Sequence, residues 1–76
     1  MLSLNDIRPG DKVKVKSLTV TGSIRRRLLD IGLVCNTVIE CVGESPLGDP
    51  KAYLIRGAII AIRSEDARGI SVSYCR

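Results

Sequence analysis

The sequence contains no histidine, no phenylalanine and no tryptophan, and its aromatic residues are two tyrosines. Without histidine, the chain lacks the commonest general base and metal ligand, so Ser/His/Asp and Cys/His catalytic arrangements are excluded. Cysteine, lysine and carboxylates remain, but they form no visible catalytic constellation, and we expect no enzyme activity. Scarce aromatics also exclude an aromatic-lined groove for proline-rich peptides, and the core must be built from Ile, Leu and Val.

Cysteines are few and long apolar runs are absent. Cys35, Cys41 and Cys75 form an odd set without paired spacing, unlike the disulfide framework of a secreted domain. The longest uninterrupted apolar run is Ala58–Ile62, far shorter than a membrane span. The first residues show no basic end followed by an apolar run, so we expect no signal peptide. These absences predict a cytoplasmic protein with reduced thiols and no transmembrane segment of its own.

The chain has a net charge of +4, and its basic residues are unevenly distributed along the sequence. Residues 39–76 hold as many basic as acidic residues, whereas basic residues outnumber Asp6, Asp11 and Asp30 in residues 1–38. The basic residues of that first half are Arg8, Lys12, Lys14, Lys16, Arg25, Arg26 and Arg27. Such asymmetry is typical of proteins that meet an acidic protein surface, nucleic acid or a membrane, and it also serves plain solubility.

The pattern of apolar residues predicts five short strands and one inserted helix. The strands are expected at residues 12–16, 37–42, 52–56, 58–63 and 70–74. Residues 21–23 offer a cap for a helix that ends near Ile31, and Gly32 follows where a left-handed residue is wanted. A short helical turn with Ser64 as its cap precedes the last strand. This order predicts a mainly β, partly open small barrel in a single domain of residues 1–76.

Three consecutive arginines, Arg25, Arg26 and Arg27, stand near the start of the expected helix. Positive charge there opposes the helix dipole, so folding alone does not favour the placement. Leu29 points away from the core and leaves an apolar side chain beside them, which is the composition of a protein-contact hot spot. Arg26 and Asp30 are expected to pair weakly in solvent. The plain alternative is a solvated helix face. The residues expected to pack on the barrel are Ile24, Leu28 and Ile31.

Nucleic-acid binding is an alternative function because the first half of the chain is basic. Lys12, Lys14 and Lys16 alternate along the first expected strand and could contact phosphate groups. Small barrels, however, usually read single strands by stacking bases on aromatic side chains. Tyr53 and Tyr74 both lie outside the basic half, so no dedicated nucleic-acid site is expected.

A carrier of Fe(II) or Zn(II) is a further alternative, with Cys35, Cys41 and Cys75 as the candidate ligands. Sites for these metals commonly use CxxC pairs or cysteine together with histidine, and this chain has neither. Cys41 falls inside an expected strand and reads as a core residue, whereas Cys75 lies beside the C-terminus. No cofactor is therefore expected, and Fe(II) or Zn(II) bound by these cysteines stays an alternative.

Five segments follow one another in an order that matches a known family. They are LxxIxPGD at residues 4–11, RRRLLDIGL at 25–33, SPLGDP at 45–50, GxxIAIR at 57–63 and EDAxxIxV at 65–72. None is specific alone, but together they resemble the ferrous iron transport protein A (FeoA) family over nearly the whole chain. Residues 34–36 depart from the family, which usually carries a proline and a glycine there, so Cys35 is a local peculiarity.

The resemblance implies an SH3-like barrel and a small bacterial accessory protein of ferrous iron uptake. Its partner would be FeoB, a membrane iron permease with a cytoplasmic GTP-binding domain, whose assembly or activity it would modulate. The protein would then be cytoplasmic and peripheral to the inner membrane through that partner, and a homo-oligomer is left open. The proline-stiffened loop at residues 46–50 offers a second contact beside the arginine helix. The expected partner-binding residues are Arg25, Arg26, Arg27, Leu29, Pro46 and Asp49.

Overall fold

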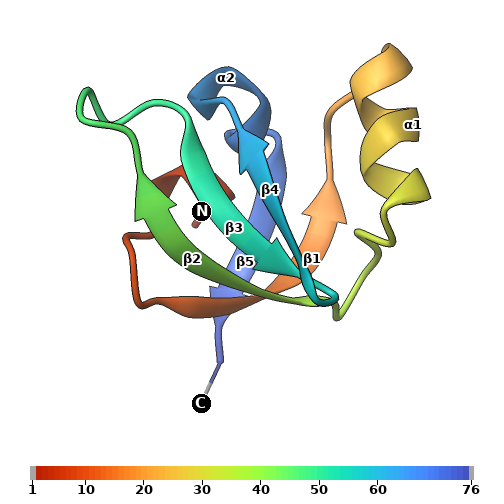
Figure 1. The fold of residues 1–76 in the computed structure, drawn as a ribbon. Helices are drawn as coiled ribbons and strands as arrows, with labels where there is room; N and C mark the ends of the chain where they lie inside the picture. Colours follow the sequence, from red (N-terminus) through yellow and green to blue (C-terminus); the bar gives the residue numbers. More distant parts are fainter. Residues whose placement is uncertain (1, 76) are drawn as a thin grey trace.

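A computed structural model describes residues 2–75 of the chain and shows one open sheet of five antiparallel strands (Figure 1). The strand order is β4-β3-β2-β1-β5, and two short helices accompany the sheet. The elements in chain order are a 3₁₀ turn η1 (Leu4–Asp6), β1 (Lys12–Leu18), α1 (Gly22–Asp30), β2 (Val38–Glu44), β3 (Lys51–Ile55), β4 (Ala58–Ile62), α2 (Ser64–Ala67) and β5 (Ile70–Tyr74). The predicted mainly β, partly open architecture is confirmed.

The alternating pattern of β1 produces one buried and one exposed face. Val13 and Val15 are buried, whereas Lys12, Lys14 and Lys16 are exposed, as the sequence predicts. The sheet curls around a core of aliphatic residues with one buried tyrosine. The largest fully buried side chains are Tyr53, Leu4, Ile7, Leu28, Leu33, Ile39, Ile55, Ile70, Val13, Val15 and Cys41.

Helix α1 ends in a Schellman motif, as its sequence predicts. Gly32 has φ 89°, a left-handed conformation that glycine adopts without a steric penalty. The Gly32 N–H donates to the Leu29 carbonyl, and the Leu33 N–H donates to the Leu28 carbonyl, both at 3.0 Å. Leu33 is fully buried and anchors the turn. At the other end, Thr21 is the N-cap residue, but its side chain makes no capping hydrogen bond.

The expected cap of α2 is corrected by the structure. Ser64 is the first helical residue, and its N–H and hydroxyl both donate to the Asp49 carboxylate, at 2.9 and 3.0 Å. Asp49 belongs to the loop between β2 and β3, so the capping acceptor comes from another part of the chain. Local sequence signals cannot reveal such a cap, because they concern only neighbouring residues.

Residues 2–7 cover the free edge of β5. Ser3 forms a bridge with Ser71, and the Val72 N–H donates to the Leu2 carbonyl at 2.9 Å. The buried side chains of Leu4 and Ile7 then close the end of the core. This N-terminal segment therefore extends the sheet beyond β5.

Three polar side chains hold that segment in place. The Lys51 ammonium donates to the carbonyls of Asn5 and Ile7, both at 2.9 Å, and the Tyr53 hydroxyl donates to the Leu4 carbonyl at 3.3 Å. Within η1, Asp6 accepts the Ser3 N–H at 2.8 Å, and this hydrogen bond lowers the pKa of Asp6. The apolar pattern of the sequence predicts no helix or strand at η1, so this element is a finding of the structure.

Candidate functional site

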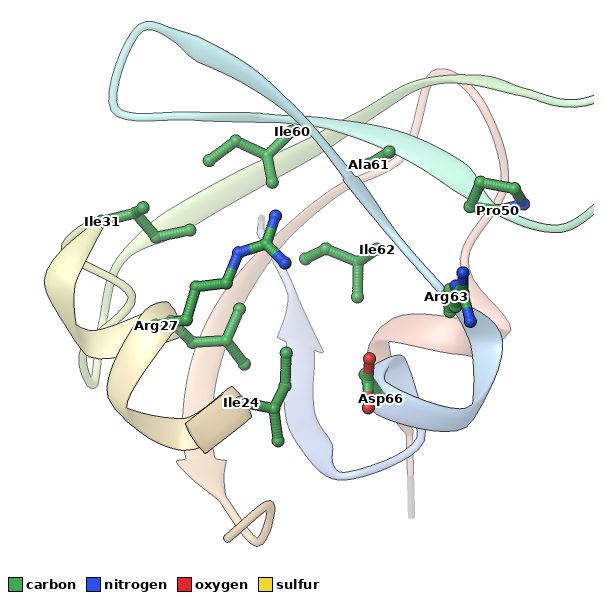
Figure 2. A pocket seen from close by; sticks show the side chains of 10 residues that line it. Ile24, Arg27, Ile31, Pro50, Ile60, Ala61, Ile62, Arg63 and Asp66 are labelled. Atoms are coloured by element: carbon green, nitrogen blue, oxygen red, sulfur yellow. The ribbon is translucent and has the colours of Figure 1, made fainter. Parts of the chain in front are cut away.

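A cavity of about 330 Å³ lies between helix α1 and strand β4, on the open side of the barrel (Figure 2). We call it the α1–β4 groove. Its walls are mostly aliphatic, and three charged residues stand among them. The lining residues are Ile24, Arg27, Leu28, Ile31, Pro50, Ile60, Ala61, Ile62, Arg63 and Asp66. A volume of this order matches the smaller binding pockets of proteins.

Helix α1 is the first wall of the groove and is held at both ends. Before the helix, the Thr19 N–H and hydroxyl donate to the Gly69 carbonyl, at 2.7 and 3.0 Å. After it, the Arg56 side chain packs so closely over Gly32 that a Cβ there would lie 2.5 Å from the Arg56 Cδ. In the middle, Leu28 is buried in the core. The expected core contacts of Ile24 and Ile31 are partial, because both are half-buried and line the groove.

Strand β4 is the second wall and the end strand of the sheet. It joins β3 through a two-residue turn, in which Arg56 and Gly57 have φ 50° and 84°, the signature of a type I′ hairpin. Ile55 and Ala58 are therefore the closing hydrogen-bonded pair, and hydrogen-bonded pairs alternate from there. It follows that Ile59 and Ala61 direct their backbone N–H and C=O groups away from β3.

The charged side chains of the groove are not paired with one another. Figure 2 shows the Arg27 side chain reaching from α1 across the opening toward Ile60 and Ile62, with Arg63 and Asp66 farther along. Within residues 2–75 the recorded ion pair is Lys12 with Glu40, at 4.0 Å. The expected pair of Arg26 with Asp30 is therefore wrong, since both side chains extend into solvent instead.

The structure divides the arginine triplet between two faces of α1. Arg25 and Arg26 lie with Leu29 on the outer face, around a shallow hollow of about 320 Å³ that also includes Gly22 and Asp30. The Arg25 Nη1 donates to the Leu18 carbonyl at 3.2 Å, and Leu29 is 40% exposed. Arg27 instead belongs to the α1–β4 groove, so the expected partner-binding face is really two adjacent faces of one helix.

The loop between β2 and β3 lies away from α1, on the other side of the molecule (Figure 1). Pro46 is exposed there, whereas Asp49 caps α2 with its carboxylate. Leu47, at the tip, is 94% exposed and was missed as a candidate. The sequence feature that could have indicated its exposure is an apolar residue between a proline and a glycine, in a segment that must form a turn.

The three cysteines lie in different environments and are not brought together. Cys35 is exposed and its thiol donates to the Lys16 carbonyl at 3.3 Å, Cys41 is buried, and Cys75 is partly exposed. Burial raises the pKa of the Cys41 thiol, which disfavours the thiolate that binds metals. In the described part of the chain, no three cysteine or carboxylate side chains are grouped to hold a metal ion.

The tyrosines and the basic residues that nucleic-acid binding would combine do not form one surface either. Tyr53 is fully buried and cannot stack on a base, whereas Tyr74 is 48% exposed at the end of β5. The exposed lysines of β1 remain as phosphate contacts, although Lys12 is paired with Glu40. None of the helices within residues 2–75 has the length and apolar character needed to cross a membrane.

Comparisons with known proteins agree with this architecture. A family model for the FeoA domain matches residues 2–74. The Fe(2+) transport protein A/Fe(2+) transporter FeoB fusion protein of Porphyromonas gingivalis is 32% identical over 71 residues, which are 93% of this chain and 8% of that protein. The chain thus spans a small part of that relative.

Solved structures of similar proteins share the fold. The FeoA protein of Chlorobium tepidum superposes with a TM-score of 0.93 at 32% identity, covering 99% of this chain and 71% of that one. Iron(II) transport protein A of Clostridium thermocellum superposes with a TM-score of 0.90 at 33% identity, and the match covers 96% of this chain and 45% of that one. The zinc complex of Stenotrophomonas maltophilia FeoA superposes with a TM-score of 0.84 at 22% identity, and the match covers 96% of this chain and 91% of that one. That protein is described as an SH3 domain protein. The fold is therefore SH3-like.

Proposed function

The chain belongs to the FeoA family, which is implicated in ferrous iron transport, and on that premise we propose that it is an accessory protein which binds a FeoB-type permease. It would act in the cytoplasm, without enzyme activity of its own, and modulate the assembly or activity of the permease. In this proposal the protein reaches the membrane through its partner.

The observation that carries this proposal is the fusion protein of Porphyromonas gingivalis. There, a segment 32% identical to this chain is named together with a ferrous iron transporter in one polypeptide. Covalent linkage places two domains at a high effective concentration, which benefits domains that act on each other. A separate chain of the same family would need a binding surface to achieve the same association.

The outer face of α1 supports the proposal as a first contact. Leu29 is 40% exposed between Arg25 and Arg26, which are themselves solvent-exposed. Arginine and an exposed apolar side chain are enriched where protein interfaces are strongest. Two positive charges on one short helix also favour an acidic partner surface and increase its rate of association.

The proposal is tested by capture of the FeoB-type permease of the same organism from detergent-solubilised membranes. Wild type should capture the permease, and Arg25→Glu with Arg26→Glu should reduce the capture at least about tenfold, because each reversed charge costs on the order of 1 kcal/mol. Lys14→Glu with Lys16→Glu is the matched control, since it reverses two exposed charges on β1 and should leave capture unchanged.

Two results would contradict the proposal. The first is a wild-type protein that does not bind the permease at any protein concentration tested. The second is capture of RNA that the lysine variant abolishes and high salt weakens, which would identify the basic half as a phosphate-binding surface instead.

A further inference from the structure

We infer that the α1–β4 groove binds an extended segment of the partner protein, which adds to the free edge of β4 as an extra strand. This inference rests on the proposed function and names the kind of segment: mostly apolar, with at least one acidic side chain. Strand addition at an exposed sheet edge uses main-chain hydrogen bonds for affinity and side-chain pockets for specificity.

The free edge of β4 is the first observation. Apart from its pairing with β3, no backbone hydrogen bond within residues 2–75 reaches Ala58–Ile62. All five residues are uncharged, none is proline, and the pairing with β3 shows no bulge. Proteins usually protect a free edge with a charged side chain, a proline or a bulge, because an unprotected apolar edge pairs with other chains. An edge left in this state is suited to a regular partner strand.

The direction of the backbone groups is the second observation. Ile59 and Ala61 present their N–H and C=O groups at this edge, as the hairpin register requires. Ala61 also lines the groove. A strand added here would lie about 4.8 Å from β4 and therefore between β4 and α1.

The lining of the groove is the third observation, and it specifies the side chains of the partner. Alternate side chains of an added strand would face the aliphatic wall formed by Ile24, Leu28 and Ile62. Arg27 and Arg63 stand against the single acid Asp66, so the groove carries an excess of positive charge. An acidic side chain in the partner segment would complement it.

The attachment of the helix wall at both of its ends is the fourth observation. Contacts with Gly69 and Arg56 hold the segments before and after α1, so the groove exists before the partner arrives. A preformed site binds more tightly because less conformational entropy is lost on binding.

The inference is tested with synthetic peptides of about ten residues that overlap along the cytoplasmic segments of the permease. Each is titrated against the isotope-labelled protein. A binding peptide should slow hydrogen exchange of the Ile59 and Ala61 amides at least about tenfold, while the Val72 amide, already bonded to Leu2, should not change. N-methylation along the peptide should weaken binding at every second position, because alternate N–H groups face β4.

A pair of variants at one position isolates the backbone contribution. Ala61→Pro removes the N–H at the free edge without removing a hydrogen bond to β3, and should weaken peptide binding at least about tenfold. Ala61→Val keeps the N–H and adds comparable bulk, so it measures the effect of bulk alone, and Ala61→Pro should bind the peptide at least about tenfold more weakly than Ala61→Val. Where Ala61→Pro fails to fold, the exchange and N-methylation measurements on the wild-type protein decide.

The outcomes separate this inference from the proposed function. Capture of the intact permease without any binding peptide, or peptide binding without protection of Ile59 and Ala61, would overturn the strand addition and leave the accessory role standing. Protection of the same amides by the protein alone, increasing with its concentration, would also overturn it and assign the edge to a second copy of this chain. Failure of the permease capture would overturn both.

Discussion

The two edges of the sheet differ in how they end. At β5, residues 2–7 cover the edge through a bridge at Ser71 and a hydrogen bond to the Val72 N–H. At β4, the edge is bare and faces the α1–β4 groove. Both strands are five residues long, so length does not explain the difference. One edge is covered by the protein's own chain, and the other has no backbone partner within residues 2–75.

The polar contacts of the molecule are distributed in the same way. Lys51 and Tyr53 reach backbone carbonyls of the N-terminal segment, across more than forty residues of chain. Arg27, Arg63 and Asp66 line the groove without a side-chain hydrogen bond or ion pair to any other residue of the described range. Charges satisfied internally stabilise a fold, whereas unpaired charges beside an apolar cavity are free to bind a ligand. The comparison therefore predicts different consequences of mutation at the two edges.

The largest effect is expected when a buried side chain of residues 2–7, the segment that covers β5, is shortened. Leu4→Ala removes a fully buried side chain and leaves a cavity, so it should lower the free energy of unfolding by about 3 kcal/mol. Ile60→Ala, at the groove, should cost only about 1 kcal/mol because Ile60 is half-buried. Urea denaturation monitored by circular dichroism measures both. Equal losses would show that the groove is as much a part of the core as the covered edge.

A smaller effect is expected when the Lys51 ammonium is removed. Lys51→Met keeps the aliphatic stem but loses two hydrogen bonds to the carbonyls of Asn5 and Ile7, which should cost about 1–2 kcal/mol. Arg63→Met is the matched control at the open edge and should change stability by less than about 0.5 kcal/mol. Thermal unfolding of the two variants compares them. A larger loss for Arg63→Met would mean that the groove charges serve the fold.

Much of this fold could be predicted from the sequence because its signals are local. The alternation of β1, the Gly32 cap of α1 and the Gly57 hairpin each depend on residues within a few positions of one another. The covering of β5 could not be predicted, since Ser3 meets Ser71 from the opposite end of the chain. Asp49 shows the same limit, because its carboxylate caps a helix that begins fifteen positions later.

The candidate site was predicted only in part for a related reason. Helical periodicity correctly placed Leu29 and the neighbouring arginines outside the core. It could not assign Arg27 to a groove, because the opposite wall is β4, a strand that follows much later in the chain. Leu47 was missed because the proline and glycine around it indicate a turn but not how far its tip extends into solvent.

The smallest effect, and the one that depends on pH, is expected at Asp6. Its carboxylate accepts the Ser3 N–H and so positions the residue that bridges to β5. Asp6→Ala should cost no more than about 1 kcal/mol, because the group is solvent-exposed. Asp66→Ala, the groove counterpart, makes no comparable hydrogen bond and should be close to neutral.

The sign of the pH dependence follows from the direction of the pKa shift. The Ser3 N–H lowers the pKa of Asp6 below its ordinary value of 3.8, so the folded state binds this proton more weakly than the unfolded state. The stabilisation by Asp6 is therefore fully present above pH 3.8 and is lost as the pH falls through the lower folded pKa. The difference in unfolding free energy between wild type and Asp6→Ala should shrink over that interval. A wild-type advantage that persists at the acid end would show that Ser3 is held at the β5 edge without the charge of Asp6.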